Sequence, residues 1–283
     1  MITDVPGIAV GHWSDHEART GCTVALVPEG TVASAEVRGG APATRELALL
    51  APDRLVDRID AIVLSGGSAF GLATADGVMA WCEEDGRGFP TPAGRVPIVP
   101  GLSLFDLAVG SASVRPGAAE GRAACEAAAT GTMEHGLVGA GTGGTVGSWQ
   151  GMDALRPAGL GGATVRAGEL IVSAAIAVNA HGDIDVTGRG LDAIEEAVLH
   201  MQEAPMGNTT IGIIATNARL DKVGCLVVAQ GGHDGLGRSL VPAHTRVDGD
   251  ALIAAATGEV PAEVDQVRLL AVAAVERAVR SLA

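Results

Sequence analysis

A polar loop runs directly into a β-branched apolar segment near residue 208, and two threonines, Thr209 and Thr210, lie at the boundary. The apolar residues 211–215 predict a buried strand, and the loop before them predicts an accessible backbone. A threonine hydroxyl in this place can attack the carbonyl carbon of the preceding residue, shift the acyl group from nitrogen to oxygen and let water release the ester. Breaking the Asn208–Thr209 bond in this way creates a new amino terminus. Its amine, which titrates at about 8, can act as the base for its own hydroxyl. The alternative is that Thr209 is an ordinary strand residue.

Further polar side chains stand at the ends of apolar runs. Asn179 follows the long run 169–178, where a side-chain amide can donate a hydrogen bond to a developing oxyanion, although asparagine is also a common turn residue. Asp248 and Asp250 flank a glycine ahead of the apolar run 251–256. They fit either an Asp–Gly turn or two carboxylates that orient and protonate the new amine. His233 is either a general base or, as the sequence favours, a structural histidine.

A second candidate site is the turn Ser65, Gly66, Gly67 and Ser68, which separates the apolar run 59–64 from a helical pattern over 69–84. Free backbone N–H groups at such a junction predict a pocket for an anion or a carbonyl, and the alternative is a tight turn without further function. The turn lacks the lysine of a P-loop, and Phe70 breaks the serine-hydrolase elbow.

The spacing of the glycines in residues 136–147 superficially resembles a dinucleotide site. No strong strand precedes them and no helix follows, so the sequence predicts no nucleotide cofactor, but close approach of the backbone to another backbone or to a ligand. His181, Asp183 and Asp185 match no zinc spacing, so no metal site is predicted.

The composition narrows the class of protein. A net charge of −14 over 283 residues argues against nucleic acids and anionic membranes as partners. No apolar run reaches the ~18 residues of a membrane span, and the first residues lack the features of a signal peptide. Four widely spaced cysteines predict buried hydrophobic residues in a reducing compartment, and we expect a cytoplasmic protein.

The hydrophobic pattern predicts an α/β protein of one domain, residues 1–283. It indicates hairpins formed by 22–27 with 31–37 and by 164–167 with 169–178. Helices are expected over residues 44–50, 69–84, 118–130, 220–231 and 261–282, with a second short helix or turn at 233–236. Antiparallel hairpins with helices before and after them predict two sheets face to face, each covered by helices.

The chain resembles the DmpA-type self-processing aminopeptidases, a family that includes D-esterases, β-peptidyl aminopeptidases and nylon-oligomer hydrolases. The resemblance is carried, in the family's order, by residues 5–12, 64–72, 96–100, 139–143, 178–180, 233–236 and 247–250. It implies a four-layer α/β/β/α sandwich with two mainly antiparallel sheets, similar to N-terminal-nucleophile hydrolases. It also implies cleavage into residues 1–208 and 209–283, no cofactor, and homo-oligomers of the processed unit.

The resemblance further implies roles for the site residues. Thr209 would be the nucleophile, Asn179 would help to hold the oxyanion, and Asp248 and Asp250 would set the protonation of the amine. Substrates would be short peptides, amides or esters with a free N-terminal residue, or oligoamides.

One departure from the family concerns the glycine-rich segment. Nylon-oligomer hydrolases of the family have a catalytic lysine after Thr-Val-Gly, where this chain has Ser148, which supplies a hydrogen bond but no charge. We therefore include Gly143 and Ser148 among the candidate substrate-binding residues. Two alternatives stay open: an acyltransferase resembling the ornithine acetyltransferases, which also self-cleave before threonine, and a binding protein with an impaired site.

Overall fold

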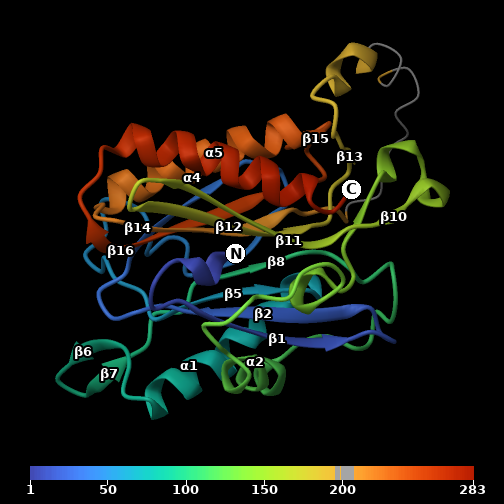
Figure 1. Cartoon of the computed structure of the whole chain (residues 1–283). Helices are drawn as coiled ribbons and strands as arrows, with labels where there is room; N and C mark the ends of the chain where they lie inside the picture. Colours follow the sequence, from blue (N-terminus) through green and yellow to red (C-terminus); the bar gives the residue numbers. More distant parts are fainter. Residues whose placement is uncertain (195–197, 199–206) are drawn as a thin grey trace.

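Two five-stranded sheets lie face to face in the computed structural model, which describes residues 1–194, 198 and 207–283 (Figure 1). The first sheet has the order β1-β2-β5-β8-β4, formed by Ala9–Asp15, Thr20–Leu26, Ala61–Ser65, Gly101–Ser103 and Ala43–Arg45. The second has the order β11-β12-β14-β16-β3, formed by Gly159–Ala167, Leu170–Val178, Ile211–Ala218, Ala251–Val260 and Val32–Val37. Only the β5–β8 and β14–β16 pairs within these two sheets are parallel, so both sheets are mainly antiparallel.

Helices cover the outer face of each sheet (Figure 1). Helices α1 (Thr74–Glu84) and α2 (Ala118–Glu126) pack on the first sheet, and α4 (Lys222–Ser239) and α5 (Val264–Arg280) pack on the second. The predicted four-layer α/β/β/α sandwich is therefore confirmed. The remaining short strands form the pairs β6–β7, β9–β10 and β13–β15, from Phe89–Thr91, Gly94–Val96, Thr145–Val146, Arg156–Pro157, Asp183–Ile184 and Leu240–Val241. Short 3-10 helices are η1 (Ile2–Asp4), η2 (Ser68–Ala73), η3 (Gly139–Gly141), η4 (Ser148–Gln150), η5 (Met152–Ala154) and η6 (Gly190–Ala193).

The strand that follows Thr209 is buried on both of its faces, which explains its uninterrupted apolar sequence. Ile211 and Ile213 point into the core between the two sheets, whereas Ile214 points into the core under α4 and α5. A third apolar cluster fills the space between the first sheet and its own helices. A strand in the middle of the sandwich gives its first residues a rigid base.

The predicted hairpin of residues 22–27 with 31–37 is wrong, because β2 and β3 lie in different sheets. β2 pairs with β1 and β5, whereas β3 pairs with β16 at the edge of the second sheet. An apolar run predicts burial but carries little information about its partner, and here the connection crosses between the layers. The second predicted hairpin is confirmed as β11–β12.

Two predicted helices also need correction. Residues 43–45 form the short edge strand β4, followed by turns, in place of the helix expected over 44–50. Helix α4 does not stop at residue 231 but runs to Ser239, so that His233 lies inside one continuous helix. Glycines, which weaken a helix in isolation, are tolerated there because they allow close packing: a Cβ at Gly235 would lie 2.6 Å from a backbone oxygen of α5.

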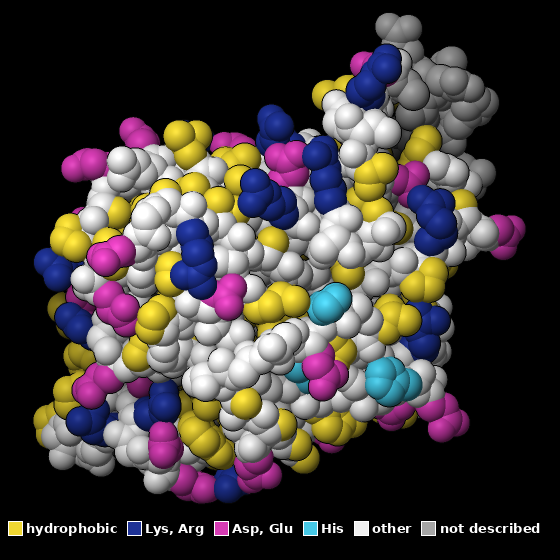
Figure 2. Space-filling view, viewed as in Figure 1, with side chains coloured by type: hydrophobic (Ala, Val, Ile, Leu, Met, Phe, Trp, Pro, Cys, Tyr) yellow, Lys and Arg dark blue, Asp and Glu magenta, His cyan; other side chains and the backbone are white. Residues whose placement is uncertain are grey.

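The distribution of charged side chains and the state of the cysteines are consistent with what the composition predicts. Figure 2 shows acidic and basic side chains interspersed on the face in view rather than gathered into one basic surface. All four cysteines are buried free thiols, as predicted. Among the residues that the structure describes, no helix is both long and apolar enough to span a bilayer.

Candidate active site

Three chain segments meet at one edge of the second sheet because of how its strands pair. β14 and β16 run parallel from Ile211 and Ala251, so the residues before them also lie side by side, and Asn208 forms a bridge with Asp248. β12 runs antiparallel to β14, which brings its last residues, and Asn179 after them, to the same edge. The topology thus gathers the four predicted catalytic residues, Thr209, Asn179, Asp248 and Asp250, from three parts of the sequence.

The Asn208–Thr209 peptide bond is fixed on both of its sides. The carbonyl oxygen of Asn208 accepts a hydrogen bond from the Gly249 N–H at 3.0 Å, and the Thr209 hydroxyl donates to the same oxygen at 2.5 Å. The Thr209 N–H donates to the carbonyl oxygen of Asn179 at 2.5 Å. Thr209 is only 4% exposed. The hydroxyl therefore lies against the carbonyl group that it would attack.

Position 249 has no room for a side chain, so glycine is required there. A Cβ atom there would lie 2.7 Å from the Thr209 hydroxyl oxygen and 2.6 Å from the carbonyl oxygen of Ala41. Only glycine lets its N–H reach the Asn208 carbonyl without displacing the hydroxyl. The sequence marked Gly249 as a turn residue, and its role as the donor to this carbonyl was missed.

Asp248 is completely buried, and its carboxylate holds two other segments. One oxygen accepts from the N–H of His181 at 3.1 Å, and the other accepts from the N–H and hydroxyl of Thr245. Burial, together with the negative charge of nearby Asp250, raises the pKa of Asp248 to about 6. The group can therefore change its protonation near neutral pH.

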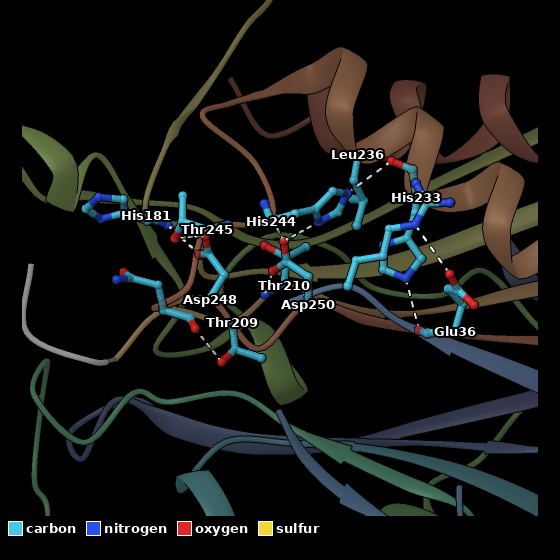
Figure 3. Close-up of polar contacts among 12 residues, drawn as sticks. Glu36, His181, Thr209, Thr210, His233, Leu236, His244, Thr245, Asp248 and Asp250 are labelled. Atoms are coloured by element: carbon cyan, nitrogen blue, oxygen red, sulfur yellow. Dashed lines mark hydrogen bonds and ion pairs between the residues drawn. The ribbon is translucent and has the colours of Figure 1, made fainter. Parts of the chain in front are cut away.

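Asp250 links the start of β14 to His244 (Figure 3). Its Oδ1 accepts the N–H of Thr210 at 2.8 Å, and its Oδ2 lies 2.8 Å from Nδ1 of His244. Burial lowers the pKa of His244, but the hydrogen bond and charge of Asp250 outweigh it, so that the net pKa is raised. Neither carboxylate accepts from the Thr209 N–H, which bonds to the carbonyl oxygen of Asn179. Asp250 instead binds the neighbouring Thr210, and Asp248 binds His181 and Thr245.

His233 and His244 contact each other, with ring centroids 4.9 Å apart. His233 is completely buried in α4, its Nε2 lies 3.0 Å from the carbonyl oxygen of Glu36, and burial lowers its pKa to about 4. These contacts agree with the structural role that the sequence favours for His233. His244, which contacts Asp250 directly, was missed: a lone histidine in a loop carries no local signal.

Both polar atoms of the Asn179 side chain form hydrogen bonds within the uncleaved chain. Its Nδ2 donates to the carbonyl oxygens of Phe105 at 2.7 Å and Gly207 at 3.3 Å, and its Oδ1 accepts from the N–H and hydroxyl of Thr145. The amide thus holds the loop just before the bond, while Gly249 serves the Asn208 carbonyl. Its predicted contact with an oxyanion stays a prediction for the cleaved form.

Ser148 reaches the side chain of the residue before the bond. Its hydroxyl donates to Oδ1 of Asn208 at 3.0 Å and lies 2.8 Å from Nδ1 of His181. A cavity of about 140 Å³ opens beside them, lined by Phe105, Ala108, Val109, Thr145, Ser148, Met152, Leu155, Gly207 and Asn208. The one lysine of the chain, Lys222, is elsewhere: its ammonium donates to the carbonyl oxygens of Leu49, Arg54 and Val56.

The expectation of free backbone donors in the turn of residues 65–68 is wrong, whereas its role in substrate binding stays a prediction. The N–H groups of Gly66, Gly67 and Ser68 are all bonded within the protein, to Gly21 O, Asp106 Oδ1 and Leu104 O. The hydroxyl of Ser65 donates to the Gly66 carbonyl. The turn packs tightly against Asp106 and the neighbouring backbone, so that its N–H groups find partners within the protein. Gly143 likewise packs on Asp106, and neither segment lines the cavity at Asn208.

The described residues hold no group of three or more His, Cys, Asp or Glu side chains placed to bind a metal ion. The polar atoms at the Asn208–Thr209 bond are hydroxyl, amide, imidazole and carboxylate groups of the chain itself. What the arrangement can do is position a threonine hydroxyl on a carbonyl whose oxygen is held by a backbone N–H, which is the geometry of acyl transfer.

The comparisons with known proteins identify the family of the chain. The model of peptidase family S58 matches residues 1–282. An aminopeptidase of Mycobacterium leprae, itself named as uncharacterised, is 43% identical over 293 residues, covering 92% of this chain and 79% of its own. A 6-aminohexanoate-oligomer endohydrolase of a Kocuria species is 31% identical over 277 residues, covering 91% of this chain and 75% of its own.

Solved structures show the same fold. The β-aminopeptidase of a Burkholderia species has a TM-score of 0.74 and 25% identity, covering 98% of this chain and 84% of that one. The L-aminopeptidase D-Ala-esterase/amidase of Ochrobactrum anthropi, described as a variant of the Ntn hydrolase fold, has a TM-score of 0.73 at 20% identity, covering 98% and 84%. With the family model spanning almost every residue and the sandwich of an Ntn hydrolase, the chain belongs to peptidase family S58.

Proposed function

We propose that the protein is a self-cleaving hydrolase of the aminopeptidase and amidase class, with Thr209 as its nucleophile. The observation that carries the proposal is the contact of the Thr209 hydroxyl with the Asn208 carbonyl, whose oxygen is also held by Gly249 N–H. The names of the relatives, an aminopeptidase, an oligomer hydrolase and a β-aminopeptidase, support the class of reaction.

In the first reaction the chain is its own substrate. Thr209 Oγ1 attacks the carbonyl carbon of Asn208, and the oxyanion that forms is stabilised by the N–H of Gly249. The C–N bond breaks, the nitrogen takes the proton that the hydroxyl has lost and becomes the amine of Thr209, and an ester joins the two parts. Water then hydrolyses the ester, which leaves a carboxylate on Asn208 and restores the hydroxyl of Thr209.

In the second reaction Thr209 acts on other molecules. Its free amine takes the proton of its hydroxyl, and the hydroxyl attacks the carbonyl of an N-terminal residue in a short peptide, amide or ester. The amine then returns the proton to the leaving group, and water releases the acyl residue. Asp250, bonded to Thr210 N–H, supports the segment that carries the nucleophile. Asp248, bonded to His181 N–H, holds the segment that follows Asn179.

The test compares Thr209→Val with Thr210→Val. Both substitutions replace a buried threonine by a residue of the same shape. The Thr210 hydroxyl has no hydrogen-bond partner among the residues that the structure describes, so its loss leaves the scissile bond untouched. Intact-mass spectrometry should show residues 1–208 and 209–283 for the wild type and for Thr210→Val, and only the full 28.2 kDa chain for Thr209→Val.

Hydrolysis of amino-acid p-nitroanilides should follow the same division, with Thr209→Val inactive. Two other results would overturn the proposal: an uncleaved wild-type chain, or a Thr209→Val variant that still yields both fragments. Transfer of the acyl group to an amino acid in preference to water would instead support the acyltransferase alternative.

A further inference from the structure

The residue before the scissile bond is held by its side chain as well as by its backbone. Asn208 is 5% exposed, and its Oδ1 accepts a hydrogen bond from the Ser148 hydroxyl at 3.0 Å. A residue that only had to be cut off would need no such grip. The contact suggests that this side chain is recognised.

Ser148 is itself held by a second group. His181 Nδ1 lies 2.8 Å from the Ser148 oxygen. Since the serine proton points to Asn208, the imidazole must donate its Nδ1–H to the serine oxygen. His181 is fixed in turn, because its backbone N–H bonds to Asp248 and its carbonyl oxygen accepts from Trp149 N–H. Ser148 and His181 are 7% and 2% exposed. The pair is therefore a rigid and buried hydrogen-bonding site.

The same site must meet the substrate. In self-cleavage and in turnover, Thr209 Oγ1 attacks the carbonyl carbon of an acyl-donating residue, and Gly249 N–H receives the oxyanion. If the carbonyl of Asn208 and that of the substrate residue occupy the same position relative to Thr209, the side chains of both residues point toward Ser148 and His181. After cleavage Asn208 is a free carboxyl terminus, and its departure exposes Ser148 to the cavity of about 140 Å³ beside it.

We propose that Ser148 and His181 recognise the side chain of the acyl-donating residue, first Asn208 and then the N-terminal residue of the substrate. They select a neutral side chain that can form hydrogen bonds, as in asparagine. The inference rests on the proposed function, because it requires that one nucleophile serves both reactions.

Two features of the Ser148–His181 pair determine which side chain is preferred. An isosteric leucine leaves the Ser148–His181 pair without its partner in a buried place, which costs rate. An aspartate brings a negative charge toward His181, whose backbone already binds the carboxylate of Asp248. Burial also lowers the pKa of His181, which disfavours the charged imidazolium that would offset that charge. We therefore expect asparagine to be preferred to both.

The experiment uses the processed enzyme with asparagine, leucine and aspartate p-nitroanilides. The expected kcat/KM for asparagine exceeds that for leucine by about 10- to 100-fold. In Ser148→Ala the ratio should fall close to one, while Ser239→Ala, a buried serine bonded to Gly235 in α4, keeps the wild-type ratio. A general loss of stability lowers all rates together and does not move this ratio.

Self-cleavage supplies an independent readout. Asn208→Leu should slow fragment formation about 10-fold in the wild-type background and have no further effect in Ser148→Ala. If the wild type is not cleaved, the proposed function has failed. If it is cleaved and hydrolyses all three p-nitroanilides at similar kcat/KM, or if Asn208→Leu cleaves at the wild-type rate, only the present inference is overturned.

Discussion

Both sheets have polar residues at the ends of buried strands, but these residues form different kinds of contact. In the first sheet, β5 ends in the turn of residues 65–68, where the backbone N–H groups of residues 66–68 bond to residues around the same sheet. In the second sheet, β14 and β16 begin side by side, and the groups before them converge on one peptide bond. The hydrogen-bonding groups of a turn can find partners close by, whereas a parallel strand pair brings together residues that are about 40 positions apart in sequence.

Each sheet has a buried aspartate next to these features, and Asp106 and Asp250 can be compared directly. Asp106 accepts the Gly67 N–H through Oδ1, while its Oδ2 has no partner among the described residues. Burial raises the pKa of Asp106, which favours its neutral form. Asp250 uses both oxygens, for Thr210 N–H and for His244. The first carboxyl supports a turn, and the second supports the start of β14 beside Thr209, the proposed nucleophile.

Between these two carboxyls, the larger effect is therefore expected for Asp250→Asn. An amide cannot accept from both Thr210 N–H and His244, so its NH₂ group meets a donor and displaces the segment that carries Thr209. A shift of that kind costs about 100-fold in rate. The measurement is the rate of fragment formation after cell-free synthesis, followed by intact-mass spectrometry.

Asp106→Asn is the matched control for that measurement. The asparagine Oδ1 keeps the bond to Gly67 N–H, and its NH₂ group replaces an oxygen that has no partner, so cleavage should run at the wild-type rate. Equal slowing in both variants would show that the two carboxyls do not differ in function, and the contrast between the sheets would be lost.

The same contrast explains what the sequence could predict. The buried strands, the two cover layers and the boundary at Thr209 follow from hydrophobic pattern, because burial on one or both faces dictates residue type. The exchange of β3 to the second sheet was missed, since strand pairing depends on partners distant in sequence. Asn179, Asp248 and Asp250 each stand at a strand end, which is a local signal.

The residues that were missed have no such signal. His181 was considered only as a metal ligand, and His244 lies in a loop; both matter because of what the fold places against them. Ser148 was noticed only because the family has a lysine at that position. Its contact with Asn208 joins residues 60 positions apart, and no pattern within either segment specifies it.

The next prediction concerns Asp248 and pH. A carboxyl whose pKa is about 6 in the folded protein, against 3.8 as the ordinary value, binds its proton more tightly when folded. Its contribution to stability is thus fully present below about pH 4 and is lost as the pH rises through about 6. Asp248→Asn removes this dependence. The loss of unfolding free energy between pH 4 and pH 7 should shrink by up to about 3 kcal/mol, measured by denaturant unfolding of the Thr209→Val chain at each pH.

Asp185 provides the control, because its pKa is shifted in the opposite direction. Burial acts to raise it, but hydrogen bonds from Gly190, Thr187 and Gly188 outweigh this and lower the pKa of Asp185 to about 2. It titrates below the chosen window, so Asp185→Asn should leave the change between pH 4 and pH 7 as it is. If Asp248→Asn also leaves it unchanged, the raised pKa of Asp248 is refuted.

The smallest functional effect is expected in the first sheet, for Ser65→Ala. The Ser65 hydroxyl bonds to the Gly66 carbonyl and lies 3.1 Å from the Thr74 hydroxyl, so its removal should lower the unfolding free energy by about 1 kcal/mol. Self-cleavage and kcat/KM should not change, because the turn does not line the cavity at Asn208. Ser148→Ala, in contrast, should alter selectivity, because the Ser148 hydroxyl contacts Asn208 and lines that cavity. Slower cleavage in a fully folded Ser65→Ala chain would restore the turn as part of the active site.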